Sequence, residues 1–441
     1  MTKVGFVSLG CSKNLVDTEV MLYNLHKAGF EITPNEEEAE IIIINTCGFI
    51  ESAKQEAIDN ILDAEKLKKW GKCRHIIATG CLVERYREEV MRELPEIDAM
   101  VGIGSLCDIA EACQAVMRGE KYTSFRDKET APLGGDRIVT TEPHTAYLKI
   151  SEGCDNLCTY CAIPLIRGKH RSRKIEDIVA EAKDLEGMGV VELNLIAQDT
   201  TRYGLDIYGE YSLAKLVKAL TKETNIPWIR LLYCYPDKIT DELIDELATN
   251  DRLLKYMDIP IQHISDSVLT RMNRHGGSAL IKETVKKLRE RVPGIILRTT
   301  AMVGFPGESD DDFAELCEFV KEAKFDRFGA FTFSPEEGTA AAEMPDQIDE
   351  QTKQDRYDCL MQTQLTVTED KNSENVGKTW TVLCDGFDTV AEVYYGRSFA
   401  DAPDVDGRVY FTSKRKINPG AFVEVKVTEA LDYDLVGEVI V

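Results

Sequence analysis

Short apolar runs alternate with amphipathic stretches along the first 120 residues. The runs KVGFVSLG, EIIIINT, HIIATG and DAMVGI have the length and β-branched content of buried strands. Helical spacing of apolar residues separates them, at about 18–28, 52–69 and 83–92 and again from 105. Strands that alternate with helices of this length predict a parallel sheet covered on both faces, in a domain spanning residues 1–121.

A polar stretch at residues 122–145 interrupts this alternation and predicts a linker. The alternation resumes over 146–375, with strand candidates AYLKIS, VELNLIA, WIRLLYC, YMDIPIQ, IILRTTAMVG and RFGAFTFS. Six β/α units are too few for an eightfold barrel and predict an open, partial (β/α)6 barrel. Over 376–441 only short strand signals and turn residues remain, which predict a small antiparallel, OB-like β-barrel.

Composition and charge indicate the compartment and the kind of partner to expect for this protein. No apolar run approaches the roughly 18 residues of a membrane helix, and MTKVGFVSLGC is too soon polar for a secretion signal. We therefore expect a cytoplasmic protein that does not enter a membrane. Acidic residues number 77 against 53 Lys and Arg, a net charge of −24, which disfavours nucleic acid over the whole surface and favours a basic partner. Clustered cysteines in a cytosolic chain more often bind metal than form disulfides.

Three cysteines follow the first strand of the predicted partial barrel. Cys154, Cys158 and Cys161 form the pattern C-x3-C-x2-C at a strand end, where β/α barrels place their chemistry. Iron–sulfur cubes usually take four thiolates, so three leave one iron open to a small molecule. A zinc site completed by a distant histidine, or three unrelated thiols, are the alternatives.

A second set of three cysteines is spread over the N-terminal domain. Cys11, Cys47 and Cys81 each follow one predicted strand, at the carboxyl edge where open α/β sheets bind ligands. Because adjacent strands lie roughly 5 Å apart, these thiolates are able to converge on one cluster. The alternative is that each is a small buried hydrophobic residue. That second interpretation fits the other seven: Cys73, Cys107, Cys113, Cys234, Cys317, Cys359 and Cys384.

Further polar and glycine-rich groups stand at strand ends of the partial barrel. Gln198 and Asp199 follow the second strand, Gln262 and His263 the fourth, and the sequence GFPGE (304–308) the fifth. Two glycines of that last sequence, Gly304 and Gly307, would let the backbone approach a ligand closely. On local grounds GFPGE is equally a plain tight turn, and His263 alone is more often a packed histidine than a ligand.

The loop ISEGCDNLCTYCAIP (150–164), with Tyr160 before the last cysteine, resembles the signature of the radical S-adenosylmethionine superfamily. The resemblance implies that the amine and carboxylate of S-adenosylmethionine chelate the open iron. It also implies that the reduced cluster cleaves this cofactor to a 5′-deoxyadenosyl radical and that Tyr160 packs near the adenine. Gln198, Gln262, Gly304 and Gly307 become candidate cofactor contacts on the same rim.

From end to end the chain resembles the methylthiotransferases, through GCSKNLVDTE, NTCGFI, TGCL, RGKHRSR, QDTTRYG and VGFPGE. The resemblance implies a flavodoxin-like N-terminal domain, a radical S-adenosylmethionine core and a terminal TRAM barrel. It also implies a [4Fe–4S] cluster on each cysteine trio, the amino-terminal one carrying the sulfur to be inserted.

One branch of this family modifies an adenosine of transfer RNA, and another an aspartate of ribosomal protein S12. DIPIQHISD lacks the Ser-Gly-Ser of the RNA-modifying branch, and GRSFADAPDVDGRVYF resembles the ribosomal-protein branch. From residue 376 onward eleven acids face seven bases, and we expect the acidic Asp401, Asp404 and Asp406 to suit a basic protein substrate.

The resemblance thus implies an enzyme that inserts a methylthio group at the β-carbon of an aspartate in S12. One S-adenosylmethionine would supply methyl and another the radical, with electrons from a flavodoxin or ferredoxin. A proton next to a carboxylate is very hard to remove, whereas abstraction of a hydrogen atom creates no further charge. A transfer-RNA methylthiotransferase and, from another class, an iron–sulfur electron carrier are the rival hypotheses.

Overall fold

The N-terminal domain is built around a parallel sheet whose central strand β3 (Ile41–Thr46) is buried on both faces. In the computed structural model, which describes residues 1–440, Ile41 and Ile43 pack on one side and Ile42 and Ile44 on the other, as the two-residue period of a strand requires. The sheet order is β2-β1-β3-β4-β5-β6, the flavodoxin-like order extended by one strand. The other strands are β1 (Lys3–Ser8), β2 (Glu31–Thr33), β4 (His75–Gly80), β5 (Ala99–Val101) and β6 (Tyr122–Ser124).

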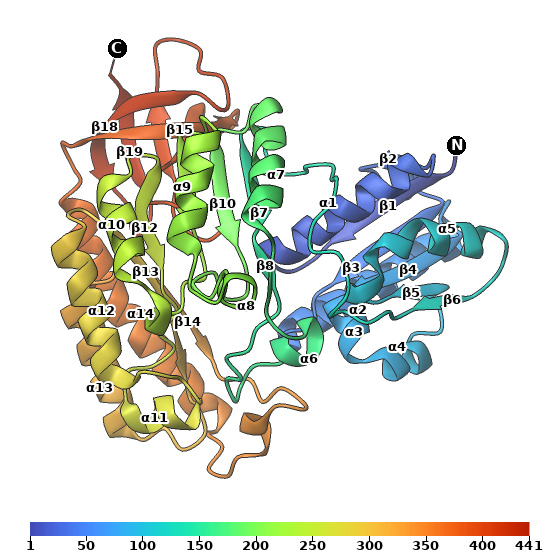
Figure 1. The fold of residues 1–441 in the computed structure, drawn as a ribbon, viewed down its shortest axis with the longest axis horizontal. Helices are drawn as coiled ribbons and strands as arrows, with labels where there is room; N and C mark the ends of the chain where they lie inside the picture. Colours follow the sequence, from blue (N-terminus) through green and yellow to red (C-terminus); the bar gives the residue numbers. More distant parts are fainter. Residues whose placement is uncertain (441) are drawn as a thin grey trace.

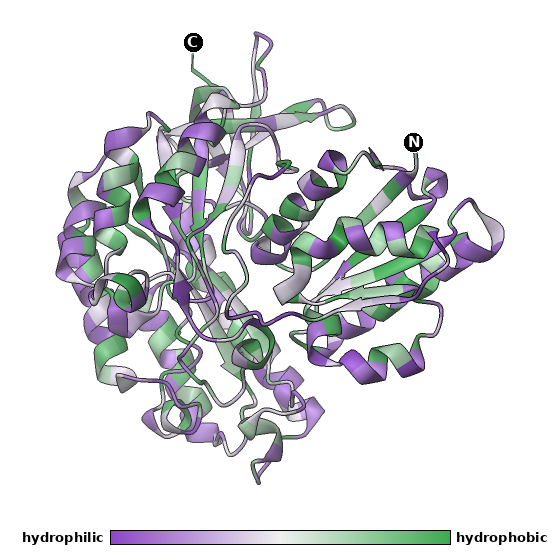
Figure 2. Ribbon diagram, turned by 45° about the vertical axis from the view of Figure 1, so that its right-hand side comes forward, coloured by the Kyte–Doolittle hydropathy of each residue, from purple (hydrophilic) through white to green (hydrophobic). Residues whose placement is uncertain are grey.

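Helices cover both faces of this sheet, with their apolar sides turned inward (Figures 1 and 2). One face carries α1 (Ser12–Lys27) and α5 (Ile109–Met117). The other carries α2 (Glu51–Trp70), α3 (Cys81–Arg85) and α4 (Arg87–Glu93). A single helix was expected over 83–92, but the backbone at Tyr86 leaves helical geometry and divides it. Strand β6 lies in the stretch expected to be linker and pairs with β5.

The second domain is an open sheet of six parallel strands in the order β14-β13-β12-β11-β10-β7. Its strands are β7 (Thr145–Lys149), β10 (Glu192–Ile196), β11 (Trp228–Leu231), β12 (Leu253–Asp258), β13 (Ile296–Val303) and β14 (Arg327–Thr332). The helices around it are α7 (Ile175–Gly187), α9 (Leu213–Glu223), α10 (Asp241–Thr249), α12 (Gly277–Arg291), α13 (Asp310–Ala323) and α14 (Glu350–Ser373). The loops add α6 (Ile163–Arg167), α8 (Leu205–Tyr208), α11 (Asp266–Arg271), β8 (Ser151–Glu152) and β9 (Arg171–Ser172).

The third domain is a closed five-stranded barrel, in the order β15-β16-β17-β19-β18. Its strands are β15 (Thr379–Asp388), β16 (Val393–Ser398), β17 (Val409–Thr412), β18 (Phe422–Ala430) and β19 (Leu435–Val439). The pairing of β17 with β19 is parallel, unlike the other four, so the barrel is not wholly antiparallel as expected. Short 3-10 turns complete the fold: η1 (Glu36–Glu38), η2 (Ile103–Asp108), η3 (Pro236–Lys238) and η4 (Ala340–Glu343). The predicted fold class, with its sheet domain, partial barrel and small terminal barrel, is confirmed.

The terminal barrel covers the amino-terminal end of the partial barrel (Figure 1). Trp228, the first residue of β11, packs edge-on against Phe422 with ring centroids 4.9 Å apart. Tyr147 and Tyr256, which lie inside the partial barrel, share an apolar cluster with Leu383 of β15. This packing closes the end of the barrel opposite the strand ends where chemistry is expected.

The acidic segment that we expected to face a basic partner instead binds the partial barrel. Asp401 is 2% exposed, and the side chain of Asp406 is also 2% exposed. Barrel side chains donate to the three carboxylates: Arg327 Nη2 to Asp401 (2.5 Å), Tyr147 Oη to Asp404 (2.8 Å) and Tyr256 Oη to Asp406 (2.6 Å). For Asp401 and Asp406, which are buried and paired with arginines, the prediction that they attract a basic substrate is therefore wrong. Asp404 is exposed and accepts from a neutral tyrosine, so for this residue the attraction stays a prediction.

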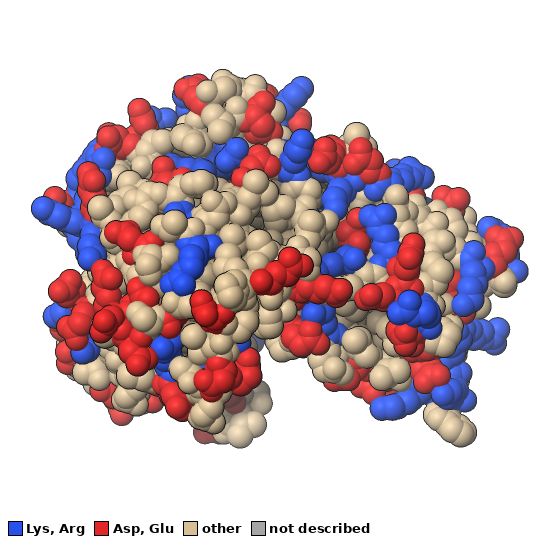
Figure 3. All heavy atoms as spheres, turned by 90° about the horizontal axis from the view of Figure 1, so that it is seen from below, with Lys and Arg blue, Asp and Glu red and all other residues tan. Residues whose placement is uncertain are grey.

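Two general features of the surface complete the description. Seen from below, on the side away from the terminal barrel, acidic and basic side chains are interspersed over the molecule, with no continuous basic stripe on this face (Figure 3). Within residues 1–440, no helix has the length and apolar character needed to cross a membrane.

Candidate functional site

The three cysteines of the N-terminal domain lie together at one edge of its sheet. Cys11 follows β1 and begins α1, Cys47 follows β3, and Cys81 follows β4 as the first residue of α3. A Cβ placed on Gly10, whose φ is +87°, would lie 3.0 Å from the Cys47 sulfur. The absence of a side chain at Gly10 therefore leaves the room that the Cys47 thiol occupies. The strand order places β1 beside β3, the switch point where flavodoxin-like sheets bind ligands.

The electrostatics of this trio are governed by burial and two cations. Desolvation, with Cys11 and Cys47 nearby, raises the pKa of the Cys81 thiol to about 12. Desolvation also opposes ionisation of Cys11, but Lys13 and Arg167 hold the pKa of that thiol below its ordinary value. Since a metal binds the thiolate, binding of a metal by this trio would release protons.

The second trio lies on the loop that joins the strand β8 to α6. Gly168 accepts a hydrogen bond from the Cys154 N–H (3.1 Å), and the Cys158 carbonyl accepts one from the Cys161 N–H (3.0 Å). Desolvation raises the pKa of Cys154 to about 11, and desolvation together with neighbouring Cys158 raises the pKa of Cys161 further. The Tyr235 hydroxyl lies 3.0 Å from the Cys158 sulfur, so this side chain, in the segment between β11 and η3, supports the loop.

A buried polar group orders this cysteine loop from beneath. Asn156, on the loop, donates to Asp199 (2.8 Å) and accepts from Lys238 Nζ (2.9 Å). Lys238 Nζ also lies 3.3 Å from Asp199. The strand-end residue Asp199 therefore positions the loop. Lys238 and Tyr235 belong to the YCYPDK segment after β11, which sequence reasoning missed because the segment carries no recognised motif.

Tyr160 packs against a buried apolar cluster next to the loop. Its ring packs edge-on against Phe305, with centroids 6.5 Å apart, and its hydroxyl accepts from Arg274 Nη1 at 3.3 Å. Arg274 also stacks over the Tyr235 ring, 4.1 Å from its centroid. Arg274 thus links the aromatic residue of the cysteine motif to the tyrosine that contacts Cys158, a role that no sequence signal indicated.

Two glutamines expected on the rim have buried side-chain oxygens with no hydrogen-bond partner in the described part of the chain. Gln198 Nε2 donates to Glu152 at 2.5 Å, and Gln262 has a left-handed backbone with φ +70°. The Oε1 atoms of both have no hydrogen-bond partner among the described residues. Buried acceptors are rarely left unpaired, so these two oxygens fit a ligand that carries N–H or O–H donors, as S-adenosylmethionine does.

The glycines of GFPGE are required by the chain's own packing. Gly304 and Gly307 both have positive φ, +72° and +71°. A Cβ on Gly304 would lie 2.3 Å from Lys353 Cγ, and one on Gly307 would lie 1.9 Å from Arg271 Nη1. Glu308 accepts from the Gly304 N–H at 2.8 Å and closes the turn. The close approach foreseen for a ligand is thus made by protein side chains, and direct cofactor contact at either glycine stays a prediction.

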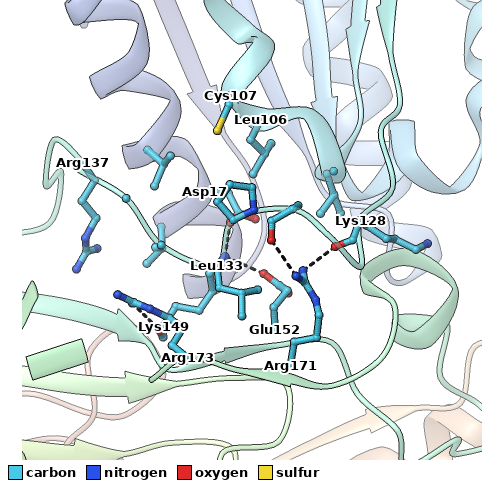
Figure 4. A pocket seen from close by; sticks show the side chains of 18 of the residues that line it. Asp17, Leu106, Cys107, Lys128, Leu133, Arg137, Lys149, Glu152, Arg171 and Arg173 are labelled. Carbon is cyan, nitrogen blue, oxygen red and sulfur yellow. Dashed lines mark hydrogen bonds and ion pairs between the residues drawn. The ribbon is translucent and has the colours of Figure 1, made fainter. Parts of the chain in front are cut away.

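A small cavity lies where the N-terminal domain, the linker and the partial barrel meet. In Figure 4, Lys149 of β7 lies between Asp17 of α1 and Glu152 of β8, at 2.6 and 2.7 Å. Arg171 binds the linker through the carbonyls of Lys128 (2.6 Å) and Ala131 (2.8 Å). Charged groups from three segments thus hold the two cysteine-bearing domains against each other.

Each trio offers three cysteine sulfurs, and cysteine thiolates are the usual protein ligands of iron–sulfur clusters. In the described part of the chain, no three Cys, His, Asp or Glu side chains converge closely enough to hold one ion. The thiolates of a cubane bind different iron atoms and therefore stand farther apart than the ligands of one zinc ion. If a cubane is held by one of these trios, three cysteines in place of the usual four would leave one cluster position for a ligand that is not protein.

Comparison with known proteins agrees with this arrangement. Residues 3–102 match Uncharacterized protein family UPF0004, residues 148–320 the Radical SAM superfamily and residues 376–440 the TRAM domain. Among solved structures, the radical S-adenosylmethionine methyltransferase TsrM from Kitasatospora setae superposes with a TM-score of 0.56 at 15% identity, over 77% of this chain and 75% of that one. The cobalamin-dependent enzyme OxsB superposes with a TM-score of 0.52 at 14% identity, over 84% of this chain and 56% of that one. These likenesses show the fold alone.

Similarity to curated proteins extends over the whole chain. The Ribosomal protein uS12 methylthiotransferase RimO of Clostridium tetani is 49% identical, over 100% of this chain and 99% of its own length. The protein of the same name from Caldicellulosiruptor saccharolyticus is 48% identical over 100% of both chains. Together with the two cysteine trios and the three domains, this identity shows that the chain belongs to the ribosomal protein uS12 methylthiotransferase family.

Proposed function

We propose that this protein inserts a methylthio group at the β-carbon of an aspartate in ribosomal protein S12, as a radical S-adenosylmethionine methylthiotransferase. The cofactors are two [4Fe–4S] clusters and S-adenosylmethionine. Cys154, Cys158 and Cys161 are the ligands of one cluster, and the N-terminal trio (Cys11, Cys47 and Cys81) holds the other. When bound, these groups supply one-electron chemistry that removes a hydrogen atom from an unactivated carbon and provides the sulfur and methyl to replace it.

The meeting of the two cysteine trios at α6 is the observation that carries this proposal. Cys81 packs in one buried cluster with Ala162 and Ile166, and Ala162 directly follows Cys161. A sulfur donor and a radical source must both reach one substrate carbon, which requires adjacent sites. An electron carrier has no such requirement.

The chain's own residues orient and enclose these groups. Asn156, Asp199 and Lys238 hold the cysteine loop in shape, so its three sulfurs are preorganised. Gln198 and Gln262 offer unpaired acceptors to the amine and hydroxyl donors of S-adenosylmethionine, while Tyr160 supplies an aromatic face beside them. Gly304 and Gly307 shape the turn on the same rim and are the remaining candidates for cofactor contact.

The partners follow from the same chemistry. The substrate is ribosomal protein S12, which appears in the names of the curated relatives. We place the reaction in the cytoplasm. Reduction of a low-potential cluster calls for a small electron-transfer protein such as a flavodoxin or ferredoxin. Since Asp401 and Asp406 are buried and paired within the chain, recognition of S12 uses groups other than these two.

The decisive assay is anaerobic turnover of the reconstituted protein with reductant and S-adenosylmethionine, offered S12 and transfer RNA in parallel. Mass spectrometry should find one hydrogen of an S12 aspartate replaced by a methylthio group. A gain only on transfer-RNA adenosine would overturn the choice of substrate and leave the cluster assignment standing.

Matched cysteine variants test the division of labour between the two trios. Cys154→Ala should abolish reductive cleavage of S-adenosylmethionine, whereas Cys47→Ala should retain some cleavage and lose methylthio transfer. Cys359→Ala, at an exposed cysteine outside both trios, is the control and should retain both activities. Equal loss of cleavage in the Cys154 and Cys47 variants, both folded, would contradict separate roles.

A further inference from the structure

The motif RGKHRSR (167–173) contains an arginine that reaches from the second domain to a cysteine of the first. Arg167 is the last residue of α6, the helix that follows the Cys154 loop, and its side chain is 1% exposed. Its Nη2 atom lies 3.4 Å from the Cys81 sulfur and 3.2 Å from Asn14 Oδ1. A side chain anchored beside one cysteine trio thus contacts a thiol of the other.

The other half of the guanidinium is held by carboxylates. Arg167 Nη1 lies 2.5 Å from Asp17 and 3.3 Å from Glu152. Lys149 pairs with the same two carboxylates, so two cations balance two anions in this buried group. Because its Nη1 side is fixed by both domains, Nη2 is oriented toward Cys81 without depending on a flexible side chain.

The chemistry of the acceptor explains why an arginine should be aimed at a cysteine. A neutral thiol is a weak acceptor, which gives little reason to direct a buried guanidinium at it. A cluster-bound thiolate carries negative charge, and hydrogen bonds from a charged donor are the strong ones. Donors to cluster sulfurs and nearby positive charge also stabilise the reduced cluster and raise its potential.

We propose that Arg167 is a positioning residue that donates through Nη2 to the Cys81 thiolate when Cys81 binds the N-terminal cluster. The inference rests on the proposed function, because it takes the N-terminal trio to hold a cluster. Arg167 continues the loop of the other trio, so this contact also fixes how the two cluster sites face each other. Loss of the donor should make the N-terminal cluster harder to reduce.

The test uses the full-length chain with Cys154, Cys158 and Cys161 all changed to Ala, so that only the N-terminal trio binds a cluster. In this parent we compare Arg167→Gln, Arg167→Lys and the control Arg171→Gln, whose guanidinium binds linker carbonyls instead. Iron and sulfide content and an EPR-monitored redox titration are measured, with circular dichroism to verify folding. We expect a more negative midpoint potential in Arg167→Gln, a smaller shift in Arg167→Lys, and none in Arg171→Gln.

The outcomes separate this inference from the proposed function. If the parent binds no cluster, the N-terminal cluster site itself fails and the role of Arg167 falls with it. If the parent binds a cluster and Arg167→Gln has the same potential and EPR spectrum, the role of Arg167 alone is refuted. If Arg167→Gln folds but loses its cluster, the Arg167→Lys variant decides. A midpoint potential below that of the parent supports the proposal, and a midpoint potential equal to that of the parent overturns it.

Discussion

Replacement of Glu192 by glutamine should loosen the terminal barrel from the partial barrel. Glu192 is fully buried at the start of β10. It accepts from Arg230 Nη2 (3.0 Å) and Thr145 Oγ1 (3.1 Å), and pairs with Arg397 of the terminal barrel. Burial alone would raise the pKa of Glu192, but Arg397 and Arg230 lower it, so the group is a carboxylate at neutral pH.

The magnitude follows from what the substitution leaves behind. In Glu192→Gln, Arg397 keeps Asp385 at 2.9 Å, whereas Arg230 is left with backbone carbonyls such as Phe399 O at 2.7 Å. Removal of one member of a buried ion pair costs roughly 3–5 kcal/mol, because the remaining charge is uncompensated. About 1.4 kcal/mol corresponds to a tenfold change in an equilibrium constant. The equilibrium between the docked and undocked terminal barrel should therefore shift toward the undocked form on the order of a hundredfold or more.

Hydrogen exchange measured by mass spectrometry tests this value. The segment 398–406 contributes buried amides such as that of Ser398, which donates to Asp401 at 3.1 Å. We expect its protection to fall by about two orders of magnitude in Glu192→Gln, since exchange there requires local opening. Glu424→Gln, at an exposed residue of β18 whose side chain accepts from Thr381, is the matched control. Protection within a few-fold of wild type would refute the reasoning.

Two smaller perturbations test the rim of the partial barrel. Burial lowers the pKa of His263 to about 4, below its value in the unfolded chain. The unfolded state therefore binds a proton first as the pH falls, and the free energy of unfolding decreases. Between about pH 7.5 and 5.5 this decrease is about 1 kcal/mol. Glu308, whose pKa burial raises to about 7, acts in the opposite direction. The test is therefore the difference in urea unfolding between His263→Asn and wild type, and an unchanged difference across that range would contradict it. Gly304→Ala should cost about 3 kcal/mol, from backbone strain at φ +72° and overlap with Lys353. Gly119→Ala, at φ +79° with open space around it, is the control and should cost about 1 kcal/mol. Equal losses of stability in the two variants would show that backbone strain acts without any contribution from overlap with Lys353.

The clustering of the N-terminal cysteines could be foreseen because it depends only on strand order. Three cysteines that each follow a strand of one parallel sheet must end at the same edge, whatever their separation in the chain. The same logic placed Gln198 and Gln262 on one rim. The roles of the cysteines as cluster ligands and of the two glutamines as cofactor contacts stay predictions, since proximity alone does not assign a role.

Contacts between domains were beyond such reasoning, because no local pattern encodes them. The three aspartates of residues 401–406 look like a solvated acidic loop in sequence. In the structure their partners are an arginine and two tyrosines on strands of the partial barrel that are distant in the chain. The need for glycine at 304 likewise comes from Lys353, on α14. Only the packed fold brings such residues together. The sequence therefore showed that the segment is acidic, but not which groups its carboxylates contact.

The two interdomain networks suggest what buried charge does in this protein. Glu192, Arg230 and Arg397 join the terminal barrel to the partial barrel, and Asp17 with Arg167 joins the N-terminal domain to the same barrel. Buried ion pairs add little net stability compared with apolar packing of similar volume, yet they penalise any arrangement that leaves one partner unpaired. Apolar contacts tolerate small shifts of one domain on another, whereas a forked arginine between two carboxylates does not. If the two cysteine trios hold clusters that act on one substrate, their reaction needs a fixed geometry more than a large stability, which would account for the charged contact at Arg167. Variants at Glu192 should therefore change the orientation of the terminal barrel, and variants at Arg167 the orientation of the N-terminal domain, before they unfold any domain.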